Sequence, residues 1–326
     1  QEEMKKLFMD IPEAIDNIQE VVDKCEAYDL AHEVLLPNFD IPTEFIDPLD
    51  ATDGGKRGEN AYLRHLTYEG AKKRYPKLTD EIKERLDFEL ETIEKTGYPG
   101  YFLIVQDFTG QARKMGVSVG PGRGSAAGSA VAYCTWITNV DPIKYDLLFE
   151  RFLNPDRISL PDIDIDFDDR GRDKIIEWVV NKYGRQQVAQ IITYGTMAAK
   201  SSVRDAARVM GLPLGDADKL AKLIPDLSLK KIFSMDEKEL KQKLGDQFPN
   251  ADSLRTTLGE NSESSRTLAQ AIRVEGTIRN TGVHPCGVII TPTDISDLIP
   301  VTTAKDSDLL LTQFDFTGQA FGDGVG

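Results

Sequence analysis

The chain is poor in the residues that cross-link small secreted domains or build metal sites from sulfur and imidazole. Its 326 residues include three widely separated cysteines, Cys25, Cys134 and Cys286, and three histidines. This spacing argues against a disulfide framework and a cysteine-based zinc site, and three histidines are too few for a histidine-rich metal cluster. Any metal must therefore be held mainly by carboxylates. The cysteine usage favours a reducing, cytoplasmic setting.

Long apolar runs are also missing, so we expect no membrane contact. No stretch approaches the roughly 18 residues that a membrane span needs, and we recognise no signal peptide. Hydrophobic residues make up 40% and charged residues 29%, which argues against disordered and collagen-like classes. The length predicts a globular protein of about two domains. The glutamine at position 1 and the glycine-rich last residues suggest a piece of something longer.

Positive charge is scarce overall, but its distribution matters more than its total. The net charge is -15, and residues 1–50 alone hold 14 acidic and 3 basic side chains. The remaining residues hold 36 basic and 40 acidic side chains and are therefore close to neutral. A nucleic-acid partner, which is bound through Lys and Arg, is not excluded by the total charge.

The apolar pattern predicts an α/β (α+β) protein that contains a helical insertion. Helical spacing over 4–28 gives way to a proline- and glycine-rich linker over 37–58. Apolar runs at 101–105, 117–119 and 188–193 predict strands, and 287–290 to 309–311 has the same character. Helices are predicted over the following ranges: 60–74, 79–96, 197–210, 216–223, 236–244 and 264–280.

The strongest chemical signal is the segment 160–167 (LPDIDIDF), in which acidic and apolar residues alternate. On a strand, residues two apart share a face and lie roughly 6 to 7 Å apart, so Asp162, Asp164 and Asp166 would line one side. Like charges on one face are tolerable if solvent or a hard cation neutralises them, and Mg²⁺ prefers oxygen ligands. A solvated acidic strand remains the alternative, with about even odds from composition.

A calcium-binding loop is a second alternative for the acidic segment, and the sequence argues against it. The loop pattern requires glycine at its sixth position and glutamate at its twelfth. Those positions hold Phe167 and Asp173 here. The β-branched residues between the acids also favour a strand over a loop.

The second signal is the glycine-rich segment 119–129 (VGPGRGSAAGS), which follows a strand-like run and precedes a helix-compatible one. Glycines allow close backbone approach, and amides at a helix start attract anions, so the segment is a candidate phosphate cradle. A Walker loop would need lysine after Gly124, where Ser125 stands, and the Rossmann spacing is off by one residue. A tight strand-to-helix turn is an equally good reading.

Basic side chains provide weaker signals. Arg151 lies in the apolar segment 147–155 just before the acidic residues, where it could snorkel, pair with Glu150 or hold a phosphate. Lys200, Arg204 and Arg208 are four residues apart and form one basic stripe on a predicted helix. A solvated helix face is the default reading of such a stripe. His284, on a Gly/Pro-rich turn, is more often structural than catalytic.

Four motifs, in this order along the chain, together resemble one family, the catalytic alpha subunits of bacterial DNA polymerase III, which are the C-family replicative polymerases. The resemblance runs from about residue 2 to residue 315. It rests on these segments: 120–129 (GPGRGSAAGS), 149–155 (FERFLNP), 160–167 (LPDIDIDF) and 190–200 (QIITYGTMAAK).

The resemblance implies a polymerase beta-like nucleotidyltransferase palm with an inserted helical thumb. The implied division is trailing helices and a linker of an N-terminal PHP-type domain over 1–60, palm over 61–196, thumb over 197–280, and a return to the palm over 281–326. The implied activity is template-directed DNA synthesis from dNTPs on a primer-template, with two Mg²⁺ ions. The sliding clamp and clamp loader are implied partners, through regions that this chain mostly lacks.

The resemblance also assigns roles to individual residues. Asp162 and Asp164 would be two of three metal-binding aspartates, and Asp166 would be supportive only. Gly124 and Ser125 would contact the incoming triphosphate. Further phosphate contacts are assigned to the following basic residues: Arg123, Arg151, Lys200 and Arg204.

The third metal-binding aspartate of the family belongs to a strand beyond residue 315, so we expect this chain alone not to extend a primer. Asp315 sits in a similar Phe-Asp-Phe setting, but residues 312–315 match the segment that precedes that strand. The short repeat of 107–112 at 315–320 (DFTGQA) is read as chance or added sequence, because no similarity surrounds it. The competing function is a noncatalytic nucleic-acid-binding or assembly module.

Overall fold

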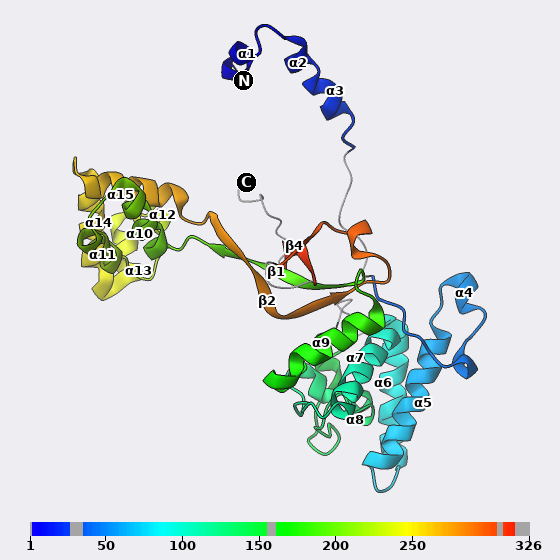
Figure 1. Cartoon of the computed structure of the whole chain (residues 1–326). Coiled ribbons are helices and arrows are strands. Elements are labelled where there is room, and N and C mark those ends of the chain that lie inside the picture. The colour runs from blue at the N-terminus through cyan, green and yellow to red at the C-terminus, as the bar shows by residue number, and fades with distance from the viewer. Residues whose placement is uncertain (1, 27–34, 155–160, 305–308, 317–326) are drawn as a thin grey trace. The chain divides into compact units, whose positions relative to one another are not determined.

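The computed structural model describes residues 2–26, 35–154, 161–304 and 309–316. The chain divides into two compact units, Gln1–Ile176 and Glu177–Gly326. Figure 1 shows the elements of each unit with the labels used below. The unit boundary falls inside helix α9.

The first unit is helical in its described part. Its α-helices are α1 Glu2–Leu7, α2 Glu13–Asp16, α3 Ile18–Asp23, α4 Asp50–Asp53, α5 Arg57–Arg74, α6 Asp80–Thr96, α7 Pro99–Lys114, α8 Ala130–Cys134 and the start of α9 Asp169–Tyr183. Three short 3₁₀ turns join them: η1 Thr43–Phe45, η2 Gly124–Gly128 and η3 Phe149–Arg151.

Helices α5 to α8 enclose the core of the first unit. Helix α6 illustrates why they form: the Thr79 hydroxyl accepts a hydrogen bond from the Ile82 amide at the start of α6, and Gly97 ends it with a left-handed φ of 78°. Ile82, Leu86, Leu90 and Ile93 are buried at helical spacing between those two ends. The core also contains the fully buried rings of Phe102 and Phe149.

The strand predicted at 101–105 is wrong, because these residues lie in α7. Residues Phe102 to Val105 are all buried, so the helix is apolar on every side over that turn. A short run of this kind does not distinguish a buried strand from a buried helix. The proline at the first position of α7, Pro99, was the better signal, since proline is favoured there.

The strands predicted at 117–119 and 160–167 are reduced to a single β-bridge between Val119 and Phe167. Leu160 lies outside the described residues, and 161–166 are extended without belonging to a strand. The alternation itself is confirmed: Asp162, Asp164 and Asp166 are exposed, while the residues between them are half-buried. The pattern reflects packing on the helical core, not membership of a sheet.

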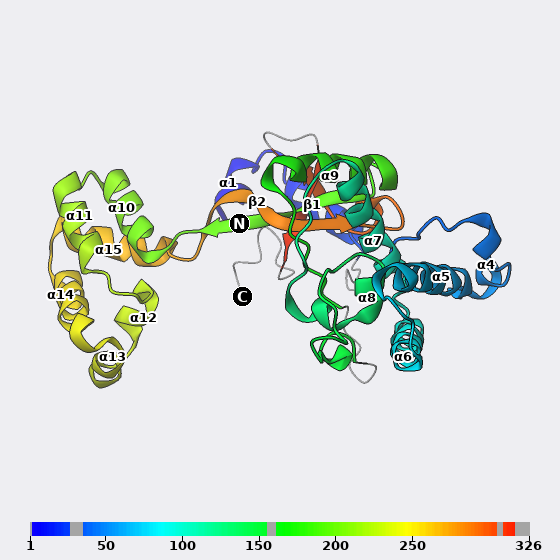
Figure 2. The same cartoon turned by 90° about the horizontal axis from the view of Figure 1, so that it is seen from below.

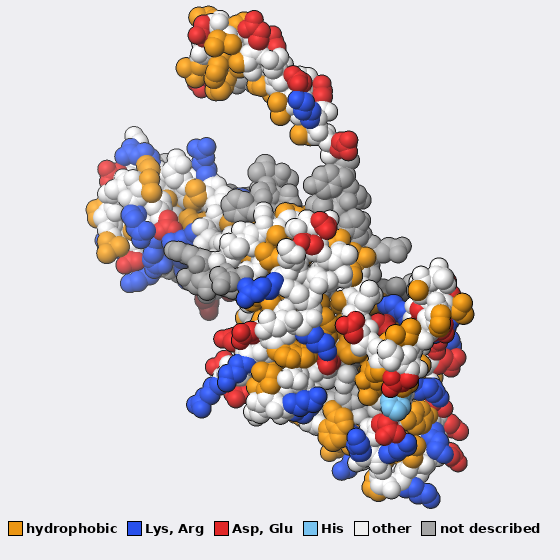
Figure 3. Space-filling view, turned by 45° about the vertical axis from the view of Figure 1, so that its right-hand side comes forward, with side chains coloured by type: hydrophobic (Ala, Val, Ile, Leu, Met, Phe, Trp, Pro, Cys, Tyr) orange, Lys and Arg blue, Asp and Glu red, His pale blue; other side chains and the backbone are white. Residues whose placement is uncertain are grey.

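The N-terminal residues form three short helices, α1 to α3, where one or two amphipathic helices were predicted over 4–28. Most of their apolar side chains are exposed, as Figure 3 shows along this segment. Leu7, Met9 and Val21 are each more than 60% exposed. Residues 27–34 lie outside the described part of the chain.

The second unit contains a four-stranded sheet in the order β2-β1-β4-β3. Its strands are β1 Val188–Thr196, β2 Ile278–Ile290, β3 Val301–Thr303 and β4 Leu310–Asp315, with the 3₁₀ turn η5 Ile295–Asp297 between β2 and β3. Strand β1 is antiparallel to β2 and parallel to β4, and β3 is antiparallel to β4. The predicted strand at 188–193 and the mixed α/β class are confirmed.

Strands β1 and β2 continue as a two-stranded ribbon beyond the part of β1 that pairs with β4 (Figures 1 and 2). The ribbon leads into a helical region, since α10 begins three residues after β1 ends. Two backbone hydrogen bonds close the junction: Met197 donates to Thr277 and Gly276 donates to Met197. One strand pair therefore carries both connections to the helices.

The helical region has its own apolar core, built around Val203, Leu229, Leu254 and Leu268. Its elements are α10 Ala199–Met210, α11 Leu214–Leu223, α12 Leu229–Ser234, α13 Glu237–Leu244, η4 Gly245–Gln247, α14 Phe248–Gly259 and α15 Glu263–Val274.

Helical periodicity predicted most of the helical region and missed parts of it. Helices α12 and α14 were missed. The helix predicted over 264–280 ends at Val274, because Gly276 adopts a φ of 83° and β2 begins at Ile278. His284 lies within β2 and not on a separate turn, and its Nδ1 accepts hydrogen bonds from the Cys286 and Gly287 amides.

Candidate functional site

The acidic segment lies against the helical core of the first unit with its carboxylates outward. Ile163 and Ile165 pack against that core, whereas Asp162 and Asp164 are exposed. The acidic residues therefore share one side of the segment, as predicted, although the segment is not a strand. Burial of alternate apolar residues fixes which way the carboxylates face.

The glycine-rich loop runs antiparallel to the acidic segment. Besides the Val119–Phe167 bridge, the Gly120 amide donates to the Asp166 carbonyl at 2.8 Å, and the Asp168 amide donates to the Ser118 carbonyl at 3.0 Å. A Cβ atom at Gly120 would lie 3.0 Å from the Asp166 Cβ, closer than side chains ordinarily approach. Glycine at this position therefore lets the two segments meet.

Arg123 joins the loop to the carboxylates. Its Nε lies 3.4 Å from Asp164 Oδ2, and its Nη1 lies 3.3 Å from Asp166 Oδ1. All three side chains are at least half exposed, so these pairs add little to stability. The next residue, Gly124, has a φ of 64°, a conformation that favours glycine, and both Gly124 and Ser125 are exposed.

Tyr101, on α7, forms a hydrogen bond with the backbone of the acidic segment, and the sequence did not suggest this role. The Ile163 amide donates to the Tyr101 hydroxyl at 3.3 Å. Burial, together with the nearby Asp162 and Asp164 carboxylates, raises the pKa of Tyr101 to about 12, although the hydrogen bond from the Ile163 amide opposes this shift. The tyrosine was missed because residues 101–105 were assigned to a strand.

Arg151 lies close to the loop in the fold. It ends the turn η3, which packs against η2, the turn that contains Gly124 and Ser125. The Arg151 side chain is exposed. The last residue of the predicted motif 149–155 and the residues after it up to 160 lie outside the described residues.

Lys200 and Arg204 belong to the second unit, on α10. Arg204 Nε pairs with Asp218 Oδ1 at 3.1 Å, and both side chains are nearly half exposed. Lys200 lines an open cleft of about 1000 Å³ in the helical region. Other lysines line the same cleft: Lys222, Lys230 and Lys231.

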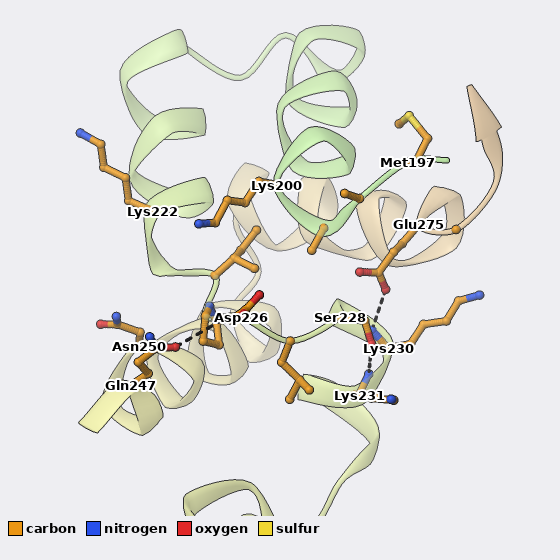
Figure 4. Close-up of a pocket in the computed structure, with 16 residues that line it drawn as sticks. Met197, Lys200, Lys222, Asp226, Ser228, Lys230, Lys231, Gln247, Asn250 and Glu275 are labelled. Atoms are coloured by element: carbon orange, nitrogen blue, oxygen red, sulfur yellow. Dashed lines mark hydrogen bonds between the residues drawn. The ribbon is translucent and has the colours of Figure 1, made fainter. Parts of the chain in front are cut away.

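The lysines of the cleft do not converge on one point. In Figure 4 the ammonium group of Lys200 points into the cleft, whereas those of Lys222 and Lys230 point outward on opposite sides. The one buried carboxylate at the cleft, Glu275, accepts hydrogen bonds from the Leu229 and Lys230 amides at 2.7 and 2.9 Å. Spread charges of this kind suit an extended polyanion better than a single small phosphate.

The carboxylates of the acidic segment are suitable ligands for Mg²⁺ in chemical type, and two of them would leave its other coordination positions to water or phosphate. Asp162 and Asp164 offer oxygen donors on one side of the chain, as a hard cation requires. Within the described ranges, no three His, Cys, Asp or Glu side chains gather into a group that could hold a metal ion.

Among the helices of the described residues, none is long and apolar enough to cross a membrane.

An exposed glycine-rich loop beside outward-facing carboxylates defines a class of site that can take a phosphate ligand together with a hard cation. The family described as the bacterial DNA polymerase III alpha NTPase domain matches residues 61–320. The chain belongs to the family of DNA polymerase III alpha subunits.

Individual relatives agree with this membership. The chain is 43% identical to the DNA polymerase III subunit alpha of Pseudomonas aeruginosa over 96% of its length, and 44% identical to that of Aquifex aeolicus over 93%. It is 42% identical to the Borreliella burgdorferi subunit over 98%. The matched part is 26%, 26% and 27% of these relatives, so the chain spans about a quarter of their length.

Proposed function

We propose that the chain carries the nucleotide and metal site of a replicative DNA polymerase, which transfers a nucleotidyl group from a dNTP to the 3′ hydroxyl of a primer. The observation that carries this proposal is the hydrogen-bonded approach of the glycine-rich loop to the acidic segment, through Gly120 and Asp166. Binding alone needs no carboxylates beside a phosphate loop. A noncatalytic nucleic-acid-binding module is therefore the weaker candidate.

In this proposal some exposed groups of the first unit bind the metal ion and others bind the triphosphate. Asp162 and Asp164 hold Mg²⁺, which when bound lowers the pKa of the attacking hydroxyl and stabilises the leaving oxygen. Gly124 and Ser125 hold the triphosphate. Arg123, which pairs with Asp164 and Asp166 in the structure, would be within reach to contact the phosphates as well. Arg151, on the adjacent turn, adds a further phosphate contact.

The helical region 197–280 corresponds to a thumb in this proposal, and the site of the first unit belongs to a palm. The helical region contains 14 basic and 12 acidic side chains, whereas the whole chain has a net charge of -15. Its exposed lysines around the cleft suit contact with backbone phosphates and not with base edges. We expect DNA binding that is independent of sequence and weakens as the salt concentration rises.

We also propose that the purified chain does not extend a primer. Two metal ions need carboxylates from more than one segment, and among the described residues no carboxylate of another segment joins Asp162 and Asp164 in a group that could hold a metal ion. Asp315, at the end of β4, is the obvious substitute, but residues 312–315 match the segment that precedes the family's third-aspartate strand. Primer extension that Asp315→Asn abolishes would contradict this account.

The experiment that separates the two candidate functions is a Mg²⁺ titration of nucleotide binding. We expect the wild-type chain to bind a fluorescent dNTP more tightly as Mg²⁺ is added, and Asp162→Asn to remove most of that gain. Asp173→Asn, which changes another exposed carboxylate of the first unit, is the matched control. If the affinity for the nucleotide does not depend on Mg²⁺, or if Asp162→Asn leaves it unchanged, the noncatalytic nucleic-acid-binding module is favoured.

A further inference from the structure

One carboxylate of the first unit is completely buried and lies directly behind the glycine-rich loop. Glu89, on α6, has no exposed surface. It accepts hydrogen bonds from the Ser129 hydroxyl at 2.8 Å and from the Ala130 and Val131 amides at 2.9 and 3.0 Å. These donors stand where the loop ends and α8 begins, so Glu89 binds the end of the loop to the core.

Arg85, one turn earlier on α6, extends this anchor to a second segment. Its Nε donates to Glu89 at 2.6 Å. Its Nη2 donates to the Gly128 carbonyl at 2.8 Å and to the Leu147 carbonyl at 3.0 Å. Gly128 ends the turn that contains Gly124 and Ser125, and Leu147 precedes the turn that ends at Arg151. One guanidinium therefore fixes both phosphate-facing segments to the same helix.

A stabilising role alone is a weak explanation for this arrangement. Burying an ion pair costs desolvation that its attraction only partly offsets, and apolar replacements are often as stable. Burial raises the pKa of the Glu89 carboxyl, against the opposing amides and Arg85. What an apolar side chain could not supply is directional acceptance from three donors, which sets the orientation of Ser129 and of the loop before it.

We propose that Glu89, with Arg85, is the positioning residue for the triphosphate loop: it holds Gly124 and Ser125 in register with Asp162 and Asp164. This inference rests on the proposed function of the loop. Glu89 itself cannot reach a nucleotide, since it is buried behind Ser129. The two residues act through the backbone of the loop and of the turn that bears Arg151.

The test uses Glu89→Gln, which keeps the shape of the side chain but replaces an acceptor oxygen with a donor group facing other donors. The matched control is Glu91→Gln on the same helix, where the exposed Glu91 pairs with the exposed Lys95. Arg85→Lys is the second variant: it keeps the charge but loses the fork that reaches two carbonyls. Arg85 is partly exposed, so this variant is expected to fold.

The readout is Mg²⁺-dependent binding of a fluorescent dNTP, with the dissociation constant and the stoichiometry measured separately. We expect Glu89→Gln and Arg85→Lys to weaken binding roughly tenfold or more at unchanged stoichiometry, and Glu91→Gln to match wild type. A purely structural role would lower the stoichiometry, because fewer molecules fold, and leave the dissociation constant of the folded molecules unchanged. That result would overturn the inference.

The outcomes also separate this inference from the proposed function. Nucleotide binding that is equal in wild type and Glu89→Gln would overturn the inference and leave the proposed function standing. Absence of Mg²⁺-dependent binding in the wild-type chain would overturn the proposed function, and the positioning role with it. Weaker binding in both variants, with the control unchanged, supports both proposals.

Discussion

One charged pair of the first unit is largely buried, whereas one charged pair of the second unit is nearly half exposed. In the first unit, the Arg85–Glu89 pair is 24% and 0% exposed and accepts or donates five further hydrogen bonds to the loop and its neighbours. In the second, the Arg204–Asp218 pair is 46% and 45% exposed. A buried pair fixes the geometry of what it contacts, because leaving any partner unpaired is costly. An exposed pair exchanges readily with solvent and ligand.

The difference matches two recognition tasks. A triphosphate beside two carboxylates must be held at one place, so its loop benefits from a rigid support. A nucleic-acid backbone presents many equivalent phosphates. The ammonium groups of the lysines around the cleft of the helical region therefore need not point to one position.

The largest effect is expected from the core of the first unit. Phe102→Ala removes a fully buried ring and should lower the free energy of unfolding of that unit by about 3 to 5 kcal/mol. Denaturant unfolding followed separately in each unit measures this. Leu148→Ala, at a side chain that is 57% exposed, is the control and should change little. An equal loss in the second unit would show that the two units do not unfold separately.

A smaller loss of folding stability is expected at alkaline pH, where Tyr101 ionises. Because its pKa is raised to about 12 from the ordinary value near 10, the folded state favours the neutral phenol. This contribution is fully present below pH 10 and is lost as the pH rises through 12. We expect wild type to lose about 2 kcal/mol more than Tyr101→Phe between pH 10 and 12. Parallel pH profiles of the two proteins would contradict the placement of Tyr101 under the acidic segment.

The cleft lysines should affect DNA binding through its salt dependence. The double variant Lys200→Ala/Lys230→Ala should flatten the slope of log K against log salt concentration by about 2, one unit for each lost phosphate contact. Lys73→Ala/Lys77→Ala, which removes two exposed lysines of the first unit, is the control. Equal slopes for both double variants, measured by anisotropy with one duplex, would remove the helical region from the DNA interface.

The smallest change in the free energy of unfolding is expected at the exposed Arg204–Asp218 pair. Arg204→Ala should change the free energy of unfolding by less than about 1 kcal/mol, because both partners are almost half exposed. Chemical denaturation at two salt concentrations measures it. A loss well above about 1 kcal/mol would contradict the small contribution expected of the exposed Arg204–Asp218 pair.

Sequence reasoning succeeded where a pattern has one local cause. Helix α6 could be predicted from Thr79, the apolar spacing and Gly97, and the outward direction of Asp162 and Asp164 followed from their alternation with isoleucines. Strand character failed at 101–105 and 160–167, because burial in a helical core produces the same apolar pattern as a sheet. Glu89 and Arg85 could not be found from the sequence, since their partners lie about 40 to 60 positions away in the chain.

The most direct test of the central claim, that the glycine-rich loop and the acidic segment form one metal and triphosphate site, is paramagnetic broadening of backbone amide signals by Mn²⁺ with a dNTP present. We predict strong broadening at Asp162, Asp164, Gly124 and Ser125, and its loss in Asp162→Asn/Asp164→Asn. Broadening centred on the acidic N-terminal helices α1 to α3 and unchanged in that variant would contradict the claim.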